Sequence, residues 1–524
     1  MFSIYRLKFD WKIYFLPVLV GILAGLGAVL FKVLINIIQN LSFRGQLSLE
    51  LNDAIPLSSS WGNLVFLVPV IGFFFVGAIV LKWAPEAKGH GVPEVMMAVF
   101  TNKGRIRPRV AAVKIVASAL CIGTGGSSGR EGPIVQIGSS IGSAIGQKLN
   151  LSGMETTTLL GCGAAAGIAA TFNAPLGGIL FAIEIIMPEF SVNTLVPLAL
   201  STSVATYIAR YLMGPESAFI VPTYAMNSSY ELLLYVLLGL CIGVVSILYI
   251  KSVYGFEDFF DDLKISPYLK PVIGGLIVGL TALAIYKLHG NYYIFGVGYS
   301  TVTDVLSGQS NNGILMLLAL MILKMFATSV TLGSGGSGGI FAPALYIGAC
   351  FGAAFGLIFN GIMPDIVSTP TAYANVGMGA IVGGAMGAPL TAIIMFFEMT
   401  RNYAIILPLT IAVVIARAFV HHNYEGTIYE IKLFRKGIKI PHERAIDMLS
   451  VAPVKDLMEP YDESKDNGMT IYQYSSLQEA LIMMNESKVN DLIATNKSGA
   501  PVGVIKKDEI LYFYTKEKSR LRKS

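Results

Sequence analysis

An arginine, a glutamate and several glycines stand together in a part of the chain that is otherwise strongly apolar. The stretch reads GGSSGREGPIVQIG and runs from Gly125 to Gly138, with Arg130 and Glu131 at its centre. Membrane hydrocarbon penalises ionisable side chains and unpaired backbone groups, so such residues persist at that depth where they serve a function. Pro133 follows the glycines and is typical of a first helical turn, so we expect a helix to begin here.

A second glycine-rich stretch, GGIFAP, ends at Pro343 and should open another helix. Two helix N-termini that face each other inside a membrane would offer unpaired N–H groups and the positive ends of two dipoles to an anion. The same dipoles would repel cations. The carboxylate of Glu131 could take the place of that anion and vacate it when protonated or swung away. This pattern therefore predicts an anion pathway with Glu131 as its gate.

The composition indicates the elements that hold these residues. The chain has 524 residues, of which 54% are hydrophobic and 14% charged, and its mean hydropathy is +0.64. A soluble protein would carry about a quarter charged residues. Apolar runs recur along the chain, and several reach the roughly 20 residues that cross a bilayer. Examples are Tyr14–Ile38, Leu64–Leu81, Leu232–Ile250 and Ile314–Ala327.

These runs predict an all-α polytopic membrane protein embedded in the lipid bilayer. Arg6, Lys8 and Lys12 precede the first run without a cleavage site, and the last segment, KEKSRLRKS, is basic. Both termini are therefore expected in the cytoplasm, with an even number of crossings. The net charge of +5 reflects these flanks and does not indicate a nucleic-acid partner. The cysteines have no metal-binding or redox spacing and are expected to be inert packing residues: Cys121, Cys162, Cys241 and Cys350.

The apolar region contains an internal repeat. SSGREGPIVQIGSSIGSAIG, from Ser127, matches SGGIFAPALYIGACFGAAFG, from Ser337, at an offset of 210. NAPLGGILFAIE matches GAPLTAIIMFFE at an offset of 214, and GHGVPE matches GVGYST at 207. The chain thus holds two related halves, roughly 60–210 and 270–420. Duplicated halves that are broken by glycine and proline predict a transport site at the repeat interface.

Other glycines in the repeat favour a structural interpretation. Gly138, Gly142 and Gly146 recur at helical spacing, as do Gly348, Gly352 and Gly356, and such stripes let helices pack closely. Several segments between the breaks are expected to be too short to span the bilayer: Ile134–Leu149, Thr157–Thr171 and Leu176–Met187.

Three stretches together resemble the signature sequences of the CLC family of chloride channels and chloride–proton exchangers, in the family's order. They are GHGVPE (Gly89–Glu94), GREGP (Gly129–Pro133) and GGIFAP, and TIYEIKLFRKG resembles the stretch after the last membrane helix. The resemblance covers about residues 10–440. It implies the inverted-repeat helical fold of that family and a homodimer with one anion pathway per subunit. Such a protein would lie in the plasma (inner) membrane.

The resemblance also implies roles for individual residues. Glu131 matches the gating glutamate, and Lys114 matches a buried basic residue that raises the pore potential, although a snorkelling lysine at a helix end would look the same. The remaining matches are Ile340 and Phe341, whose amides hold the central anion, Tyr429, whose hydroxyl contacts it, and Gly129, Arg130 and Gly132 in the outer part of the pathway.

Two positions depart from the family pattern. His90 stands where a serine hydroxyl usually coordinates the anion; its imidazole either donates an N–H instead or points aside, which leaves the preference for chloride over nitrate or fluoride open. Ile185 stands where exchangers commonly carry an inner glutamate, directly after Glu184. This favours a passive chloride channel, with a proton-coupled chloride antiporter as the alternative. Glu184 and its counterpart Glu398 are expected to be structural.

The chain changes character after the membrane region. Residues 1–430 are predicted to be the transport domain and 431–450 a linker, while 451–524 read as a small cytosolic α/β module with a helix at Ser476–Ser487 and a strand near Asp491–Thr495. This module resembles a single CBS repeat. Since such repeats work in pairs, the other member could come from the second subunit. We expect it to stabilise the dimer rather than bind nucleotide.

Other classes of protein explain less of the chain. GSSG at Gly126–Gly129 contains the pattern of rhomboid-like serine proteases, but that class leaves the repeat unexplained. Neither glycine run continues into Gly-Lys-Ser/Thr, which excludes a P-loop. A secondary transporter of another solute shares the repeat architecture but has no need of opposed helix N-termini. We therefore expect a transporter or channel, not an enzyme, with chloride as its ligand and with no metal or other cofactor.

Overall fold

The computed structural model describes residues 11–48, 59–187, 192–215, 219, 226, 228–308, 313–438, 449, 452–461 and 468–521. The chain forms two compact units, Met1–Ile440 and Pro441–Ser524. Eight helices in the described residues are long and apolar enough to cross a membrane. The prediction of an integral, polytopic helical membrane protein is therefore confirmed.

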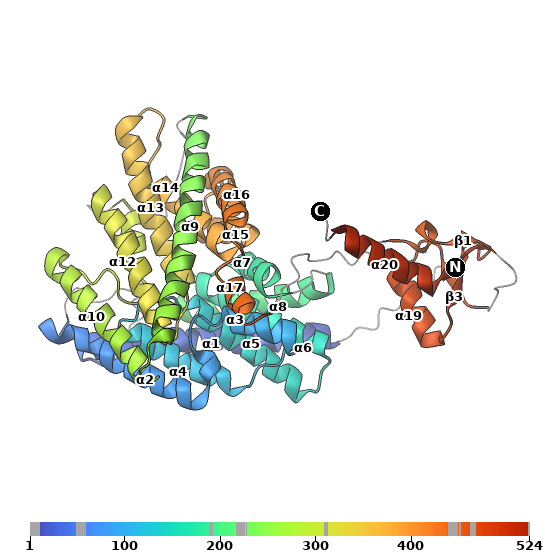
Figure 1. Ribbon diagram of the computed structural model, residues 1–524, viewed down its shortest axis with the longest axis horizontal. Helices are drawn as coiled ribbons and strands as arrows, with labels where there is room; N and C mark the ends of the chain where they lie inside the picture. Colours follow the sequence, from blue (N-terminus) through green and yellow to red (C-terminus); the bar gives the residue numbers. More distant parts are fainter. Residues whose placement is uncertain are drawn as a thin grey trace. The chain divides into compact units, whose positions relative to one another are not determined.

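The regular elements of the first unit in its described residues are helices, joined by loops (Figure 1). Its first half contains α1 (Trp11–Arg44), α2 (Leu67–Trp83), α3 (Val92–Thr101), α4 (Arg109–Gly123), α5 (Glu131–Lys148), α6 (Gly153–Phe172), α7 (Pro175–Phe181), continued by a π-helical turn at Ala182–Ile186, and α8 (Val192–Met213). Its second half contains α9 (Glu231–Asp262), α10 (Leu269–His289), α11 (Tyr299–Leu306), α12 (Ile314–Gly333), α13 (Phe341–Ile362), α14 (Pro370–Ile381), continued by a π-helical turn at Val382–Met386, α15 (Pro389–Thr400), α16 (Ile406–Asn423) and α17 (Glu430–Arg435).

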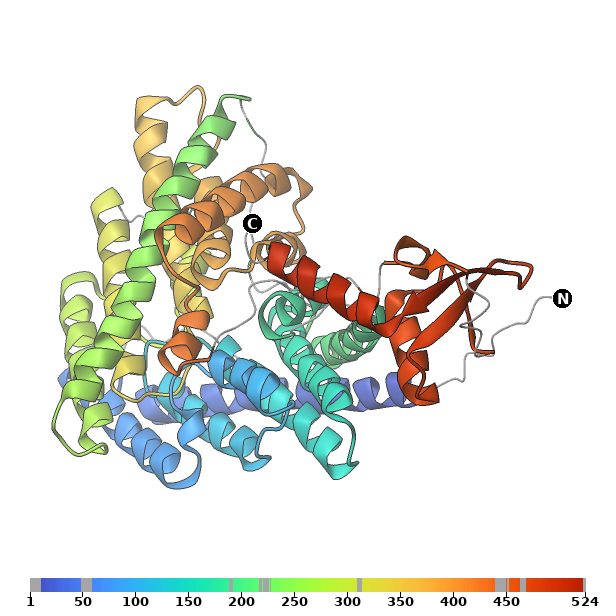
Figure 2. The same ribbon diagram turned by 45° about the vertical axis from the view of Figure 1, so that its right-hand side comes forward.

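The two halves pack their helices in the same way. Helix α5 lies against α6 as α13 lies against α14, and α1 lies against α8 as α9 lies against α16. Across the halves, α2 packs on α10 and α7 packs on α15. Figures 1 and 2 show α9, α12 and α13 side by side within the second half. The duplicated sequence has therefore folded into two related helical halves that share one interface.

The glycine stripes of α5 and α13 are packing surfaces, as their spacing predicted. A Cβ atom on Gly138 would overlap the carbonyl oxygen of Gly163 in α6. The same relationship recurs in the other half, where Gly348 of α13 meets the carbonyl of Gly377 in α14. The offset between Gly163 and Gly377 is that of the repeat. Close backbone contact thus fixes α5 on α6 and α13 on α14.

The segment predicted at Thr157–Thr171 is longer in the structure. Helix α6 begins at Gly153, because the Ser152 hydroxyl accepts the amide hydrogen of Glu155 and the Glu155 carboxylate accepts that of Ser152. This reciprocal cap satisfies backbone donors that would otherwise be unpaired at the start of the helix. At about 1.5 Å per residue the helix is roughly 30 Å long, which corrects the predicted bounds of the segment. Helix α6 is not one of the eight helices that are long and apolar enough to cross a membrane.

The described residues of the second unit form a four-stranded sheet and two α-helices. The strands are β1 (Glu459–Pro460), β2 (Thr470–Tyr472), β3 (Asp491–Thr495) and β4 (Pro501–Lys506), in the order β1-β4-β3-β2. Strand β4 pairs antiparallel with both neighbours, whereas β2 pairs parallel with β3, with Thr470 opposite Ile493. Helices α19 (Leu477–Ser487) and α20 (Lys507–Leu521) complete the unit, so the α/β character predicted for this module is confirmed. Residues 431–438 of the predicted linker belong to the first unit, and 439–448 lie outside the described residues.

Candidate functional site

The two glycine-rich stretches of the repeat meet in the interior of the first unit. The amide of Gly129 donates to the carbonyl of Gly339 at 2.7 Å, and the amide of Gly339 donates back to Gly129 at 2.6 Å. Beside them, the Gly89 amide donates to Gly336 at 3.0 Å and the Gly338 amide to Gly89 at 3.3 Å. These bonds hold together the backbone segments that lead into α3, α5 and α13. The start of α5 at Glu131 and the start of α13 at Phe341 therefore lie close together, as the sequence predicted.

The carboxylate of Glu131 lies at the meeting point of these helix starts. One oxygen accepts the hydroxyl of Tyr299, the first residue of α11, at 2.5 Å. The other accepts the amide of Ala342, in the first turn of α13, at 3.3 Å. The guanidinium of Arg130 lies over the Tyr299 ring, 5.1 Å from its centroid. Glu131 is 1% exposed, so this negative charge is held inside the protein by donors from the opposite half.

His90 lies directly behind the start of α5. A Cβ atom on Gly132 would overlap the carbonyl oxygen of His90, so only glycine allows the α3 and α5 segments to approach this closely. The imidazole is 2% exposed, and neither ring nitrogen has a hydrogen-bond partner among the described residues. Its ring centroid is 5.9 Å from that of Tyr429. A buried polar ring without partners is uncommon, and a water, an ion or a ligand can supply the missing partner.

The other predicted anion ligands are held from behind by α9. The hydroxyl of Tyr249 donates to the carbonyl of Ile340 at 3.0 Å, and that of Tyr254 donates to the carbonyl of Ile428, next to Tyr429, at 2.5 Å. Ile340 is the residue before α13, and Tyr429 is the residue before α17. The ring of Phe341 packs on Phe172, with 5.3 Å between centroids. Hydrogen bonds from α9 therefore fix the backbone next to Ile340 and next to Tyr429.

Lys114 lies one layer behind the site and does not snorkel. Its ammonium is completely buried and donates to the carbonyls of Ala87 and Gly89 at 3.0 and 2.8 Å. Lys324, 210 residues later, repeats the arrangement: it is equally buried and donates to Ile294 and Gly296 at 3.3 and 2.8 Å. Each lysine thus holds the loop that precedes α3 or α11 in its own half.

Glu184 and Glu398, for which the matched positions predicted a structural role, each bond the half of the chain opposite to their own. The carboxylate of Glu184 accepts the amides of Leu390 and Thr391 at 2.9 and 2.6 Å, at the start of α15. Glu398 accepts the amide of Gly177 at 2.7 Å, at the start of α7. A carboxylate at a helix N-terminus satisfies free donors and the dipole, which is a structural role. Ile185, next to Glu184, is buried and carries no titratable group.

Sequence reasoning missed Tyr299 and Lys324. The signal for both was the repeat itself, because GVGYST aligns with GHGVPE and Lys324 aligns with Lys114. The residue that matches Tyr299 in the other half is Val92, which has no hydroxyl group. The repeat therefore does not predict a polar side chain at position 299. Only the folded arrangement, which brings α11 across to Glu131, reveals its contact.

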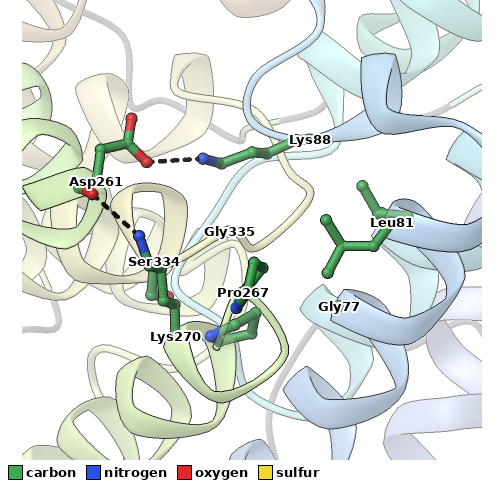
Figure 3. Close-up of a pocket in the computed structure, with 10 residues that line it drawn as sticks. Gly77, Leu81, Lys88, Asp261, Pro267, Lys270, Ser334 and Gly335 are labelled. Atoms are coloured by element: carbon green, nitrogen blue, oxygen red, sulfur yellow. Dashed lines mark hydrogen bonds and ion pairs between the residues drawn. The ribbon is translucent and has the colours of Figure 1, made fainter. Parts of the chain in front are cut away.

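A separate cavity of about 200 Å³ lies between α2, α10 and the backbone that precedes α13 (Figure 3). Two lysines line it, and both are engaged by Asp261: Lys88 bonds its carboxylate at 3.2 Å and Lys270 its backbone carbonyl at 3.1 Å. None of the residues predicted for the anion pathway lines this cavity. Among the described residues there is no group of three or more side chains able to hold a metal ion.

Comparison with known proteins identifies the relatives of this chain. Residues 72–421 match the family described as voltage-gated chloride channel. The H⁺/Cl⁻ exchange transporter ClcA of Vibrio cholerae is 34% identical over 412 residues, which are 77% of this chain and 85% of that protein. A protein of Ralstonia nicotianae, described as a ClcB-like chloride channel protein, is 33% identical over 72% of this chain and 86% of its own length.

Solved structures share the fold. The structure of a slow cyanobacterial Cl⁻/H⁺ antiporter superimposes with a TM-score of 0.70 at 27% identity, covering 81% of this chain and 98% of the antiporter chain. That of a eukaryotic CLC transporter superimposes with a TM-score of 0.67 at 18% identity, covering 95% and 98%. The inverted-repeat helical fold predicted from the sequence is therefore confirmed.

Proposed function

The chain belongs to the CLC family of chloride channels and transporters, and on that premise we propose that it exchanges chloride for protons across a membrane, with Glu131 as the residue that couples the two. The similarity to exchangers supports this proposal, because the ClcA relative and the 27% identical structure are both named as proton-coupled. The sequence alone favoured a passive channel because of Ile185. The comparisons favour the antiporter alternative instead.

The observation that carries the proposal is the position of the Glu131 carboxylate. It accepts hydrogen bonds from donors at the starts of α11 and α13, so a negative group already occupies the place where helix N-termini favour an anion. An arriving chloride and an ionised Glu131 repel each other and compete for these donors. Protonation removes the charge from Glu131 and frees the donors for chloride, so that each anion step requires a proton step.

The remaining predicted residues complete this pathway. The amides of Ile340 and Phe341, the hydroxyl of Tyr429 and one N–H of His90 hold the anion while it passes. Gly129, Arg130 and Gly132 shape the segment around the gate. Lys114 contributes positive charge from behind the α3 loop. An isolated chloride inside a membrane is stabilised by such fixed donors and dipoles, which replace its lost hydration.

Several further features belong to the same proposal. Two copies of the chain form a homodimer with one pathway each, in the plasma (inner) membrane and with both termini in the cytoplasm. The sheet-containing unit acts as a CBS-like module that stabilises the dimer. The passive chloride channel remains the second candidate function, and the buried, apolar Ile185 favours it.

Coupled flux measurements test the proposal. The purified protein is reconstituted in chloride-loaded liposomes, and chloride efflux and proton uptake are recorded together. We expect chloride efflux to drive protons uphill at a fixed ratio, and Glu131→Gln, which cannot exchange a proton, to abolish that proton movement. The exposed Glu425→Gln serves as the control. Chloride efflux without uphill proton movement in the unmodified protein would establish the passive channel instead.

A further inference from the structure

Tyr299 occupies a special position in the repeat. It is the first residue of α11, in the segment that corresponds to the one leading into α3. On the α3 side, His90 and Tyr429 lie near the anion site. On the α11 side, Tyr299 is the residue whose polar atom reaches Glu131. The two halves thus present different donors to one pathway.

The hydroxyl of Tyr299 is held in place from several directions. Its ring is 4% exposed and lies beneath the guanidinium of Arg130, 5.1 Å from the centroid. The ring of Phe219 meets it edge-on, with 4.9 Å between centroids. Behind α11, Lys324 fixes the carbonyls of the preceding loop. An aromatic ring confined in this way presents its O–H in one direction, toward Glu131.

We propose that the Tyr299 hydroxyl is itself a ligand of the transported anion, and that it alternates between the Glu131 carboxylate and that anion. The proposal rests on the anion pathway proposed above. The Glu131 carboxylate occupies the position proposed for the anion. A carboxylate and a chloride ion both need hydrogen-bond donors, and burying either one in apolar surroundings without donors is unfavourable. The O–H of Tyr299 and the N–H of Ala342 supply those donors. When Glu131 leaves, the same two donors hold chloride.

The same hydrogen bond also lets Tyr299 hold Glu131 in the position that blocks the anion, which we call the latch role of Tyr299. A phenol O–H donating to a carboxylate at 2.5 Å stabilises the ionised form, in which Glu131 blocks the anion position. Arg130 and Tyr429 are further charged or titratable groups close to Glu131. Removing the hydroxyl favours the neutral form. The pH profile of transport then shifts toward higher pH, because Glu131 takes up its proton more readily.

The decisive experiment separates the ligand role from the latch role. In Glu131→Ala there is no carboxylate to latch, so Tyr299→Phe can act only through the anion. We expect Glu131→Ala/Tyr299→Phe to bind chloride about tenfold more weakly than Glu131→Ala by titration calorimetry, which is the effect of one lost hydrogen bond to an ion. Equal affinities would overturn the proposal.

Tyr235→Phe provides a matched control in the same background. It removes another buried phenol, whose hydroxyl reaches the Glu231 carboxylate at 3.5 Å within α9, and it should leave chloride affinity unchanged. The single variant Tyr299→Phe should shift the pH profile of chloride efflux, whereas Tyr235→Phe should not. If the unmodified protein moves no chloride, this result contradicts both the proposed function and the present inference. If it moves chloride and Tyr299→Phe changes neither affinity nor pH profile, the inference alone falls.

Discussion

Gly129 and Gly339 exchange two backbone hydrogen bonds, at 2.7 and 2.6 Å, although 210 residues separate them in the chain. Both lie in the unwound segments that precede α5 and α13. Two-way pairing of this kind fixes the helix starts opposite each other, in the antiparallel sense that an inverted repeat requires. The anion site proposed here therefore depends on a backbone contact and not on side chains alone.

Substitution of Gly132 tests how closely these segments must approach. A Cβ atom in Gly132→Ala meets the carbonyl oxygen of His90, and overpacking of this kind costs about 1 to 3 kcal/mol. We expect a lower unfolding temperature in detergent and strongly reduced chloride flux in liposomes. Gly255→Ala in α9, where a Cβ meets nothing within 4 Å, is the control and should retain both. A fully active Gly132→Ala would show that the contact is loose in the working protein.

The two buried lysines should behave alike. Lys114→Met and Lys324→Met each remove two hydrogen bonds to buried carbonyls together with a buried ammonium group. The carbonyls of Ala87 and Gly89 keep a second donor each, the Ser337 hydroxyl and the Gly338 amide. We expect each variant to lose about 3 kcal/mol of stability and to show a weaker chloride dependence of transport, since the neighbouring loops lead to the site. Thermal unfolding and flux at a series of chloride concentrations measure these effects. Lys287→Met, at an exposed position, is the comparison. Opposite outcomes for the two lysines would contradict the symmetry of their roles.

His90 offers a test of the donor that replaces the usual serine. His90→Ala removes the imidazole N–H and should weaken chloride binding about tenfold, whereas His90→Ser restores a hydroxyl donor and should recover most of the loss. Titration of both variants with chloride and nitrate measures affinity and preference together. If His90→Ala binds chloride as tightly as the unmodified protein, the imidazole points aside and the backbone amides suffice.

Glu184 should prove structural. Glu184→Gln keeps one acceptor oxygen but loses the charge that satisfies the start of α15, so we expect a loss of about 1 to 2 kcal/mol in stability. The ratio of protons to chloride moved by the remaining folded protein should not change. Glu398→Gln, its counterpart at α7, should give the same pattern. A changed ratio in Glu184→Gln alone would place this carboxylate on the proton route.

The amino-acid sequence determined the class of protein and much of the site. Hydropathy established the membrane helices, and the offsets of 207, 210 and 214 established the repeat. Glycine and proline located the starts of α5 and α13, because these residues act through local backbone geometry. The close packing of helices at Gly138 and Gly348 also followed from helical spacing, although their partners Gly163 and Gly377 did not. The short length assigned to α6 was wrong because the Ser152 cap was not weighed.

Tertiary structure alone decided which side chains meet at the candidate site. Nothing local to GVGYST indicates that Tyr299 bonds Glu131, since the contact joins residues 168 positions apart in opposite halves. Lys324 lies in the middle of the apolar helix α12, and only the folded structure shows the carbonyl groups to which it donates. Local propensity and periodicity act over a few residues, whereas these contacts arise only when two complete halves pack together.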